Sequence, residues 1–344
     1  MTGLPRWARL TATALLVVAV VSLPLNASPF VNLQLSIVLA TAVALLGLDV
    51  LTGWTGQVSL GQSAFYGIGA YAVAVCTARG WPLLVGLAVT VLIAGLVGAI
   101  IAIPAVRLRG YALSMVTLAL PVVAVPLAKR LDGLTGGSPG LATRTVSAPE
   151  WSGLDNDQWR FLVIALISAA VFLLVRNVLK GRHGRALATI RSSEVLATAM
   201  GIPVQRYKVG AFVVAAACGG VGGGLYVVAV QFISPETLIV TFSISLLAVL
   251  VIGGLRSTLG PLLGAAFYVL VPNVTGAVDA GQSYLLYGLC VLLVMFLLPG
   301  GLASAVHRVL AGAARVLPGS RPAVPDLPSQ HPIPAPPLPE REVR

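Results

Sequence analysis

Residues 181–208 read GRHGRALATIRSSEVLATAMGIPVQRYK, the only long polar interval with helical patterning between apolar runs. Six Lys and Arg residues lie between positions 180 and 208, and the positive-inside rule places such a short loop in the cytoplasm. We expect its middle to be one helix from Arg185 to Met200. Gly184 can serve as the start, and Gly201 followed by Pro203 is a stop signal.

Apolar side chains lie on several faces of this expected helix. Leu187, Ile190 and Ala197 share one face at helical spacing, together with the acid Glu194. Leu196 and Met200 fall elsewhere, so the apolar and polar faces are not sharply separated. A helix lying on lipid would separate them more cleanly. The pattern therefore favours a segment contacted by protein on more than one side, with an ordinary basic loop between helices as the alternative.

The composition is that of an integral membrane protein. Of the 344 residues, 57% are hydrophobic and 10% are charged, against roughly 25% charged in soluble domains, and the mean hydropathy is +0.95. The net charge of +11 could suggest nucleic acid, but the basic residues are spread between apolar runs, which favours membrane orientation instead. The three cysteines all lie inside apolar segments, so we expect packing roles and no disulfide framework.

Apolar runs of bilayer length recur along the chain. A membrane-spanning helix needs about 20 apolar residues, which predicts an all-α fold, a polytopic transmembrane helix bundle of about ten spans. An even number puts both termini on one side, and most Lys and Arg residues then lie in the inner loops. The candidate spans are Leu10–Leu25, Leu33–Leu51, Val58–Thr77, Leu83–Ile103, Tyr111–Ala128, Phe161–Val178, Val209–Phe232, Leu238–Leu255, Leu259–Ala277 and Tyr284–Leu298.

The spans divide the chain into three parts. We expect a cytoplasmic N-terminus at 1–9 and a transmembrane domain at 10–302. Its cytoplasmic loop is at 179–208 and its longest outer loop is at 129–160. The proline-rich tail at 303–344 cannot bury a core, so it should be disordered and cytoplasmic. The expected location is the inner or plasma membrane, crossed many times.

Residues that carry chemistry are scarce. His183, His307 and His331 lack metal-ligand spacing, which predicts no metal site. No Lys follows a Gly, so there is no Walker A motif, and any ATP is used by another chain. We expect no catalytic residues, no cofactor bound by this chain and no enzyme activity. Asp49, near the inner end of a span, gives limited support to an ion-coupled mechanism.

A second informative stretch, residues 51–71, reads LTGWTGQVSLGQSAFYGIGAY. Its glycines make a poor independent helix at membrane depth. Broken backbone is tolerated there where it lines a wet cavity, whereas small residues can also serve tight helix contacts without any ligand. Both readings stay open. Under the first, the candidate translocation path consists of Gly56, Gln57, Ser59, Gly61 and Gln62.

Residues 47–71 resemble the signature of the LivM-type permease of branched-chain amino acid ABC importers. The similarity continues in order through most of the chain, over roughly residues 35 to 302. Two departures are Asp49, where the family more often has Asn, and Arg256, which interrupts a usual Gly-Ser pair. Further matching motifs lie at 107–113, 135–141, 184–186, 199–202, 253–265 and 298–302.

The resemblance implies a function, a coupling site and partners. Glu194-x-x-Ala197-x-Ala199-x-Gly201 is similar to the cytoplasmic segment with which ABC importer permeases dock on their ATPase. This implies an ATPase-coupling role for Gly184, Arg191, Glu194, Ala197 and Gly201. The implied partners are a homologous second permease chain, two ABC ATPase subunits that use ATP, an extracytoplasmic substrate-binding protein and membrane lipid, without nucleic acid.

The resemblance leaves the substrate open. Branched-chain or related small neutral amino acids are the first expectation. Permeases similar to this one handle urea, short amides or other amino acids, which are the alternatives within the family. An ion-coupled secondary transporter, supported by Asp49, is the alternative outside it.

Overall fold

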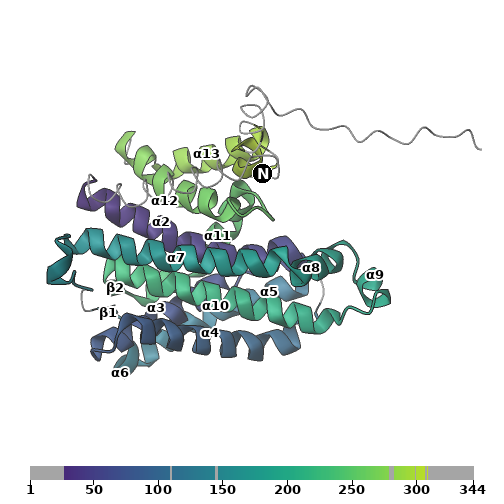
Figure 1. Cartoon of the computed structure of the whole chain (residues 1–344), viewed down its shortest axis with the longest axis horizontal. Coiled ribbons are helices and arrows are strands. Elements are labelled where there is room, and N and C mark those ends of the chain that lie inside the picture. Colours follow the sequence, from purple (N-terminus) through teal and green to yellow (C-terminus); the bar gives the residue numbers. More distant parts are fainter. Residues whose placement is uncertain are drawn as a thin grey trace, which may run out of the picture.

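A computed structural model gives the fold of the described residues, which are 27–108, 111–143, 146–278, 283–298, 300–306 and 308. These ranges are almost entirely helical, which confirms the predicted all-α class (Figure 1). The long helices are α2 (Pro29–Leu48), α3 (Gln62–Ala78), α4 (Leu83–Ala105), α5 (Tyr111–Arg130), α7 (Asn156–Lys180), α10 (Val204–Val230), α11 (Val240–Gly253), α12 (Gly260–Val278) and α13 (Ser283–Leu297).

The short elements lie between these helices. A π-helical segment, η1 (Asp49–Trp54), continues α2 without a break. The others are α6 (Asp132–Thr135), η2 (Glu150–Ser152), α8 (Arg182–Ser192), α9 (Glu194–Ala199) and η3 (Pro235–Leu238). Strands β1 (Leu141–Ala142) and β2 (Phe232–Ile233) pair antiparallel, with Leu141 opposite Ile233.

Nine of the ten candidate spans correspond to a long helix. The first candidate, Leu10–Leu25, lies outside the described residues, as do the N-terminus at 1–9 and most of the tail at 303–344. Within the described part, five helices are long and apolar enough to cross a membrane. They are Pro29–Trp54, Leu83–Ala105, Ala112–Arg130, Asn156–Lys180 and Val204–Val230.

The helices reach further into the loops than the sequence suggested. Helix α5 continues to Arg130, and α7 begins at Asn156, so both enter the predicted outer loop at 129–160. The early start of α7 has a local cause, because the side chains of Asp155 and Gln158 form a capping box at its first turn. Helix α7 likewise continues to Lys180, inside the predicted loop at 179–208.

Helix α10 is the centre of the bundle and packs against α2, α3 and α4. Figure 1 shows α2, α7 and α10 running side by side along the long axis. Glycines permit the close crossing of α3 and α10. A Cβ at Gly69 would overlap the carbonyl oxygen of Gly220, and one at Gly223 would overlap that of Tyr66. This is the close approach that small residues allow between membrane helices.

The bundle has two different ends. Helices α8 and α9 project at one end, here named the α9 end, and the β1–β2 pair lies at the opposite end, here named the β end (Figure 1). Helix α12 packs on α2, and α13 packs on α12. The polar interval 181–208 therefore lies at one tip of the helix bundle.

Candidate functional site

The predicted single helix from Arg185 to Met200 is wrong, because the structure forms two helices there. The backbone of Ser193 is extended, with φ −162° and ψ 120°, and this ends α8 and starts α9. The Ser193 hydroxyl accepts a hydrogen bond from the Leu196 amide at 3.2 Å, which is an N-cap. The sequence contains no Gly or Pro at this point, so the capping serine is the physical reason for the break.

The two glycines that frame the interval play different roles from each other. Helix α8 begins at Arg182, so Gly184 is not its start but a buried residue of its first turn. A Cβ at Gly184 would overlap the carbonyl group of Leu179 at the end of α7. Gly201 does form the predicted stop, with φ +74°, and the amide of Ile202 closes the helix end by donating to the Ala197 carbonyl.

Helix α8 is anchored within the bundle. Its buried residues include Ala186, Leu187 and Ile190, and it contacts α7, α10 and η1. Arg191 Nη1 donates to the carbonyl of Gly53 and, at 3.5 Å, lies near that of Thr52. The guanidinium thus meets the carbonyl end of a helix, where cations are favourable. Of the predicted coupling residues, Arg191 is the one that joins α8 to the α2 span.

Asp49, the first residue of η1, binds the loop between α11 and α12. Its side chain is 1% exposed, and Oδ1 accepts a hydrogen bond from the Arg256 amide at 2.8 Å. Arg256 has φ +60°, a region that favours glycine, and its guanidinium lies 5.4 Å from the centre of the Trp54 ring. Asp49 therefore fixes the loop between α11 and α12 to the end of α2.

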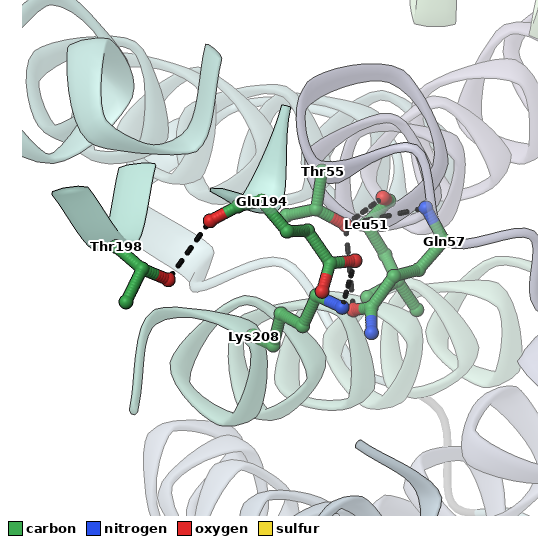
Figure 2. A network of polar contacts seen from close by, with 6 residues as sticks. All are labelled: Leu51, Thr55, Gln57, Glu194, Thr198 and Lys208. Atoms are coloured by element: carbon green, nitrogen blue, oxygen red, sulfur yellow. Dashed lines mark hydrogen bonds and ion pairs between the residues drawn. The ribbon is translucent and has the colours of Figure 1, made fainter. Parts of the chain in front are cut away.

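Glu194 has a partner within its own chain. Its carboxylate pairs with Lys208 Nζ from α10 at 2.5 Å (Figure 2). The Lys208 side chain is 5% exposed and that of Glu194 is 40% exposed. Thr198 adds a hydrogen bond of 2.8 Å from its hydroxyl to the Glu194 carbonyl oxygen. The pair holds α9 against α10, so this carboxylate is largely occupied inside the chain.

The exposed side of α9 carries three large apolar side chains. Val195 is 80% exposed, Leu196 52% and Met200 65%, and these three residues are named here the α9 patch. Ala197, which the resemblance put at the interface, is fully buried against its own chain. Contiguous exposed apolar side chains at a projecting tip are typical of an interaction site. The sequence signal for the patch was the apolar residues that fell off the main helical face.

The third predicted span, Val58–Thr77, begins later than expected. Helix α3 starts at Gln62, and residues 56–61 form a non-helical segment after the end of η1. The polar backbone of this segment is satisfied by α5, since Ser114 Oγ donates to the Val58 carbonyl at 3.0 Å and the Leu60 amide donates to Thr117 Oγ1 at 3.0 Å. Buried irregular backbone of this kind occurs in membranes where protein covers it.

The predicted path residues lie mostly inside the chain. Gln57, Ser59 and Gln62 are buried, as is Gly61, whereas Gly56 is exposed with φ +77°. The backbone amide of Gln57 donates to the Leu51 carbonyl at 3.2 Å, and the Thr55 hydroxyl lies 3.4 Å from Gln57 Oε1 (Figure 2).

Gln62 joins two helices near their middles. Its side-chain amide nitrogen donates to the Ala44 carbonyl of α2 at 2.9 Å and to the Ala215 carbonyl of α10 at 3.2 Å. Both donors of this amide are thus used by backbone carbonyls of the same chain. This geometry favours helix packing as the role of Gln62.

Helices α3 and α11 begin beside each other. The Ser63 amide donates to Ser243 Oγ at 2.9 Å, and that hydroxyl lies 2.8 Å from Ser63 Oγ, which donates to the Leu238 carbonyl at 3.2 Å. The segment before α3 arrives from the α9 end, and the segment before α11 arrives from the β end. Two interrupted helices therefore meet inside the bundle, an arrangement that transporters use near their substrate sites.

Within the described residues, no three His, Cys, Asp or Glu side chains lie together in a way that could hold a metal ion. Residues 136–140 read GGSPG and match the G-x-S-x-G pattern of a nucleophile elbow. They lie in the loop between α6 and β1, whereas that motif requires a strand-to-helix turn. The pattern therefore carries no catalytic meaning here.

Comparison with known proteins agrees with the membrane architecture. Residues 31–298 match the family described as branched-chain amino acid transport system / permease component. The chain is 30% identical over 317 residues to the high-affinity branched-chain amino acid transport system permease protein LivM of Escherichia coli, covering 84% of this chain and 73% of that one. It is 29% identical, with the same coverage, to the LivM protein of Salmonella typhimurium. A probable LivM protein of Methanocaldococcus jannaschii is 26% identical, covering 60% of this chain and 64% of that one.

Proposed function

The chain belongs to the family of permease components of branched-chain amino acid transport systems, and from this premise we propose that it translocates branched-chain or related small neutral amino acids as one permease subunit of an ABC importer. The observation that carries the proposal is the match to this family over residues 31–298, nearly the whole transmembrane part. The family is a transport component, so the proposal assigns transport and no catalytic step to this chain.

The α9 end is the proposed ATPase-docking end. Helix α9 presents the apolar α9 patch outward while α8 is anchored in the bundle. Apolar side chains that a partner removes from water stabilise a complex by about 25 cal/mol per Å² of apolar area buried. With this end in the cytoplasm, the positive-inside rule is obeyed by the basic interval 180–208, and both termini are proposed to be cytoplasmic. ATP is then used by two separate ATPase subunits.

The remaining partners complete the importer. A second, homologous permease chain would lie beside this one in the inner or plasma membrane. An extracytoplasmic substrate-binding protein would dock at the β end, where the long outer loop and the β1–β2 pair lie. In such an importer, the binding protein performs most of the substrate recognition. An importer for urea, short amides or other amino acids would therefore differ mainly in the ligand that its binding protein recognises.

The contacts described above supply a mechanical route from α9 to the bundle interior. Closure of the ATPase pair would move α9 and α8 as one body, since they are consecutive and share contacts. Arg191 would pass this motion to the Gly53 carbonyl at the end of η1. The non-helical residues 56–61 follow directly and lead to the start of α3. The ATPase must bind the two conformations with different affinity for this to bias transport.

Residues 56–61 are proposed as the movable wall of the translocation path. Gly56, Gln57, Ser59 and Gly61 supply small or polar groups next to the junction of α3 and α11. Gln62 would be the fixed end of this wall, because both of its amide donors hold neighbouring helices. A Gln57→Leu and Ser59→Val double variant should lower uptake while leaving ATPase binding intact. Unchanged uptake would mean that these residues only pack.

The test of function is uptake by the reconstituted complex. The chain is co-expressed with its neighbouring ATPase, permease and binding-protein candidates, placed in vesicles, and assayed for labelled leucine uptake with and without ATP. We expect ATP-dependent uptake that unlabelled isoleucine or valine competes away. ATP hydrolysis without leucine uptake would redirect the assay to urea, amides and other amino acids. Uptake driven by an ion gradient without the ATPase would overturn the ABC assignment.

A further inference from the structure

A groove runs between α7 and α10 and is closed at the α9 end by α8. Its volume is about 470 Å³, and nearly all of its lining is apolar. Leu174 and Val178 of α7 form one wall, Gly210 and Val214 of α10 form the other, and Leu187 of α8 closes the end. Since α7 and α10 are both membrane helices, the groove opens toward the lipid or toward a neighbouring membrane protein.

The closed end of the groove is basic. His183 and Arg206 line it there and are both exposed, and the His183 ring lies 5.9 Å from that of Tyr207. Residues 176–208 contain seven Lys and Arg residues and one acid, Glu194. That acid is paired with Lys208, so it does not neutralise the cations at the groove.

We propose that the groove binds one anionic phospholipid from the leaflet at the α9 end. Its phosphate would lie at Arg206 and His183, and one acyl chain would lie along Leu174, Val178 and Val214. Basic pockets between membrane helices recognise anionic headgroups in this way. The phenol of Tyr207 lies at the same level, where amphipathic aromatic side chains are favourable.

The charge distribution argues for a lipid and against a second membrane chain as the occupant. The groove is apolar along its length and cationic at one end only, which matches a molecule that is apolar with one anionic end. A transmembrane helix placed there would have to supply a counter-charge for Arg206, because an unpaired buried charge is costly, whereas an anionic lipid brings that charge with it. Leu187 belongs to α8, so a bound chain would also brace the helix that carries Arg191.

Gly210 provides a direct way to fill the groove. A Cβ added at Gly210 meets no heavy atom within 4 Å, so the first carbon of a Gly210→Leu side chain enters open space. Gly288 of α13 is equally open, so Gly288→Leu is a matched control in another membrane helix. For charge, Arg206→Gln is compared with Arg185→Gln, an exposed cation of α8 that does not line the groove.

The experiment measures phospholipid bound to the full chain purified in detergent with its accompanying subunits. Phosphatidylglycerol and zwitterionic phosphatidylethanolamine are titrated separately, and bound lipid is counted by native mass spectrometry. A photo-crosslinking residue at position 210 identifies the neighbour in the membrane. We expect preferential phosphatidylglycerol binding, a loss of about fivefold in affinity for Arg206→Gln, and a larger loss for Gly210→Leu, with both controls unchanged.

Three outcomes would overturn the proposal. One is equal binding of the two lipids by the unaltered chain. Another is phosphatidylglycerol binding by Gly210→Leu that equals that of Gly288→Leu. The last is crosslinking from position 210 to a protein chain in place of lipid, which would assign the groove to the permease interface. None of these readouts depends on uptake, so they do not bear on the transported substrate.

Discussion

Helices α8 and α9 are consecutive, short and derived from one polar interval, yet they are built in opposite ways. Helix α8 buries Ala186, Leu187 and Ile190 and holds the end of the α2 span through Arg191. Helix α9 buries only Ala197 among its six residues and exposes the apolar α9 patch. The first helix is therefore part of this chain's core, whereas the second leaves an apolar face exposed, which is typical of an interaction site.

The comparison also separates two charged residues that the family resemblance had grouped. Arg191 reaches inward to backbone carbonyls at a helix end. Glu194 is held by the nearly buried Lys208 and keeps α9 in place. Neither arrangement needs a partner to be satisfied. The contrast predicts that the binding energy for the ATPase comes from the α9 patch. Arg191 would transmit the motion of α8 to η1, and Glu194 would hold α9 against α10.

The largest effect is expected from charge placed in the α9 patch. A Val195→Asp and Leu196→Asp double variant puts two carboxylates where the partner should bury apolar surface. Burying a carboxylate without a counter-charge is strongly unfavourable, so the ATPase should no longer co-purify. The thermal stability of the chain itself should stay unchanged, because both side chains are exposed.

Gln205→Asp is the control for that variant, since Gln205 is exposed on α10 outside the patch. It should leave ATPase binding intact. Retention of the ATPase by the double variant would show that α9 is not the docking helix.

A smaller effect is expected from Arg191→Ala. Hydrogen bonds to charged groups contribute about 1.5 to 3 kcal/mol, so loss of the contact with Gly53 should lower uptake per ATP hydrolysed about tenfold. The ATPase should still bind, because the α9 patch is untouched. The measurement is the ratio of labelled amino acid uptake to phosphate release in vesicles.

Two further variants sharpen this prediction. Arg191→Lys should give an intermediate ratio, because one ammonium can reach a carbonyl but lacks the planar fork. Arg185→Ala, an exposed residue of the same helix, should behave as the unaltered chain. A normal ratio for Arg191→Ala would show that α8 does not transmit motion through η1.

The smallest effect is expected from Glu194→Gln. Loss of the counter-charge for Lys208 should lower stability by about 1 kcal/mol, since the half-exposed carboxylate limits the penalty, and should lower the melting temperature by about 2 to 4 °C. ATPase binding should persist. The measurement is thermal unfolding of the purified chain together with ATPase co-purification.

A double-variant cycle with Lys208→Met tests whether the pair acts as a unit. Glu194→Gln combined with Lys208→Met should be less destabilised than the two single effects predict by addition. If Glu194→Gln alone releases the ATPase at unchanged stability, Glu194 is an interface residue, as the resemblance implied. The Glu194–Lys208 pair would then bind the ATPase and not only hold α9 in place.

Sequence reasoning predicted the helix inventory well and the site residues unevenly. Nine candidate spans became helices because runs of about 20 apolar residues have few alternatives in a membrane. The break at Ser193 was missed, since serine is compatible with a helix interior and its capping role depends on the local backbone. The late start of α3 at Gln62 was missed because the hydrogen bonds that satisfy residues 58–60 come from Ser114 and Thr117 of α5.

The sequence by itself determined the all-α membrane class, the order of the nine long helices described, and the basic, partly helical character of 181–208. These follow from composition, apolar run length and the spacing of charges along the chain, which are local properties. Only the tertiary structure decided that Glu194 pairs with Lys208, that Arg191 holds the end of α2, and that α3 and α11 begin side by side. Those contacts join residues distant in sequence, and packing around α10 brings them together.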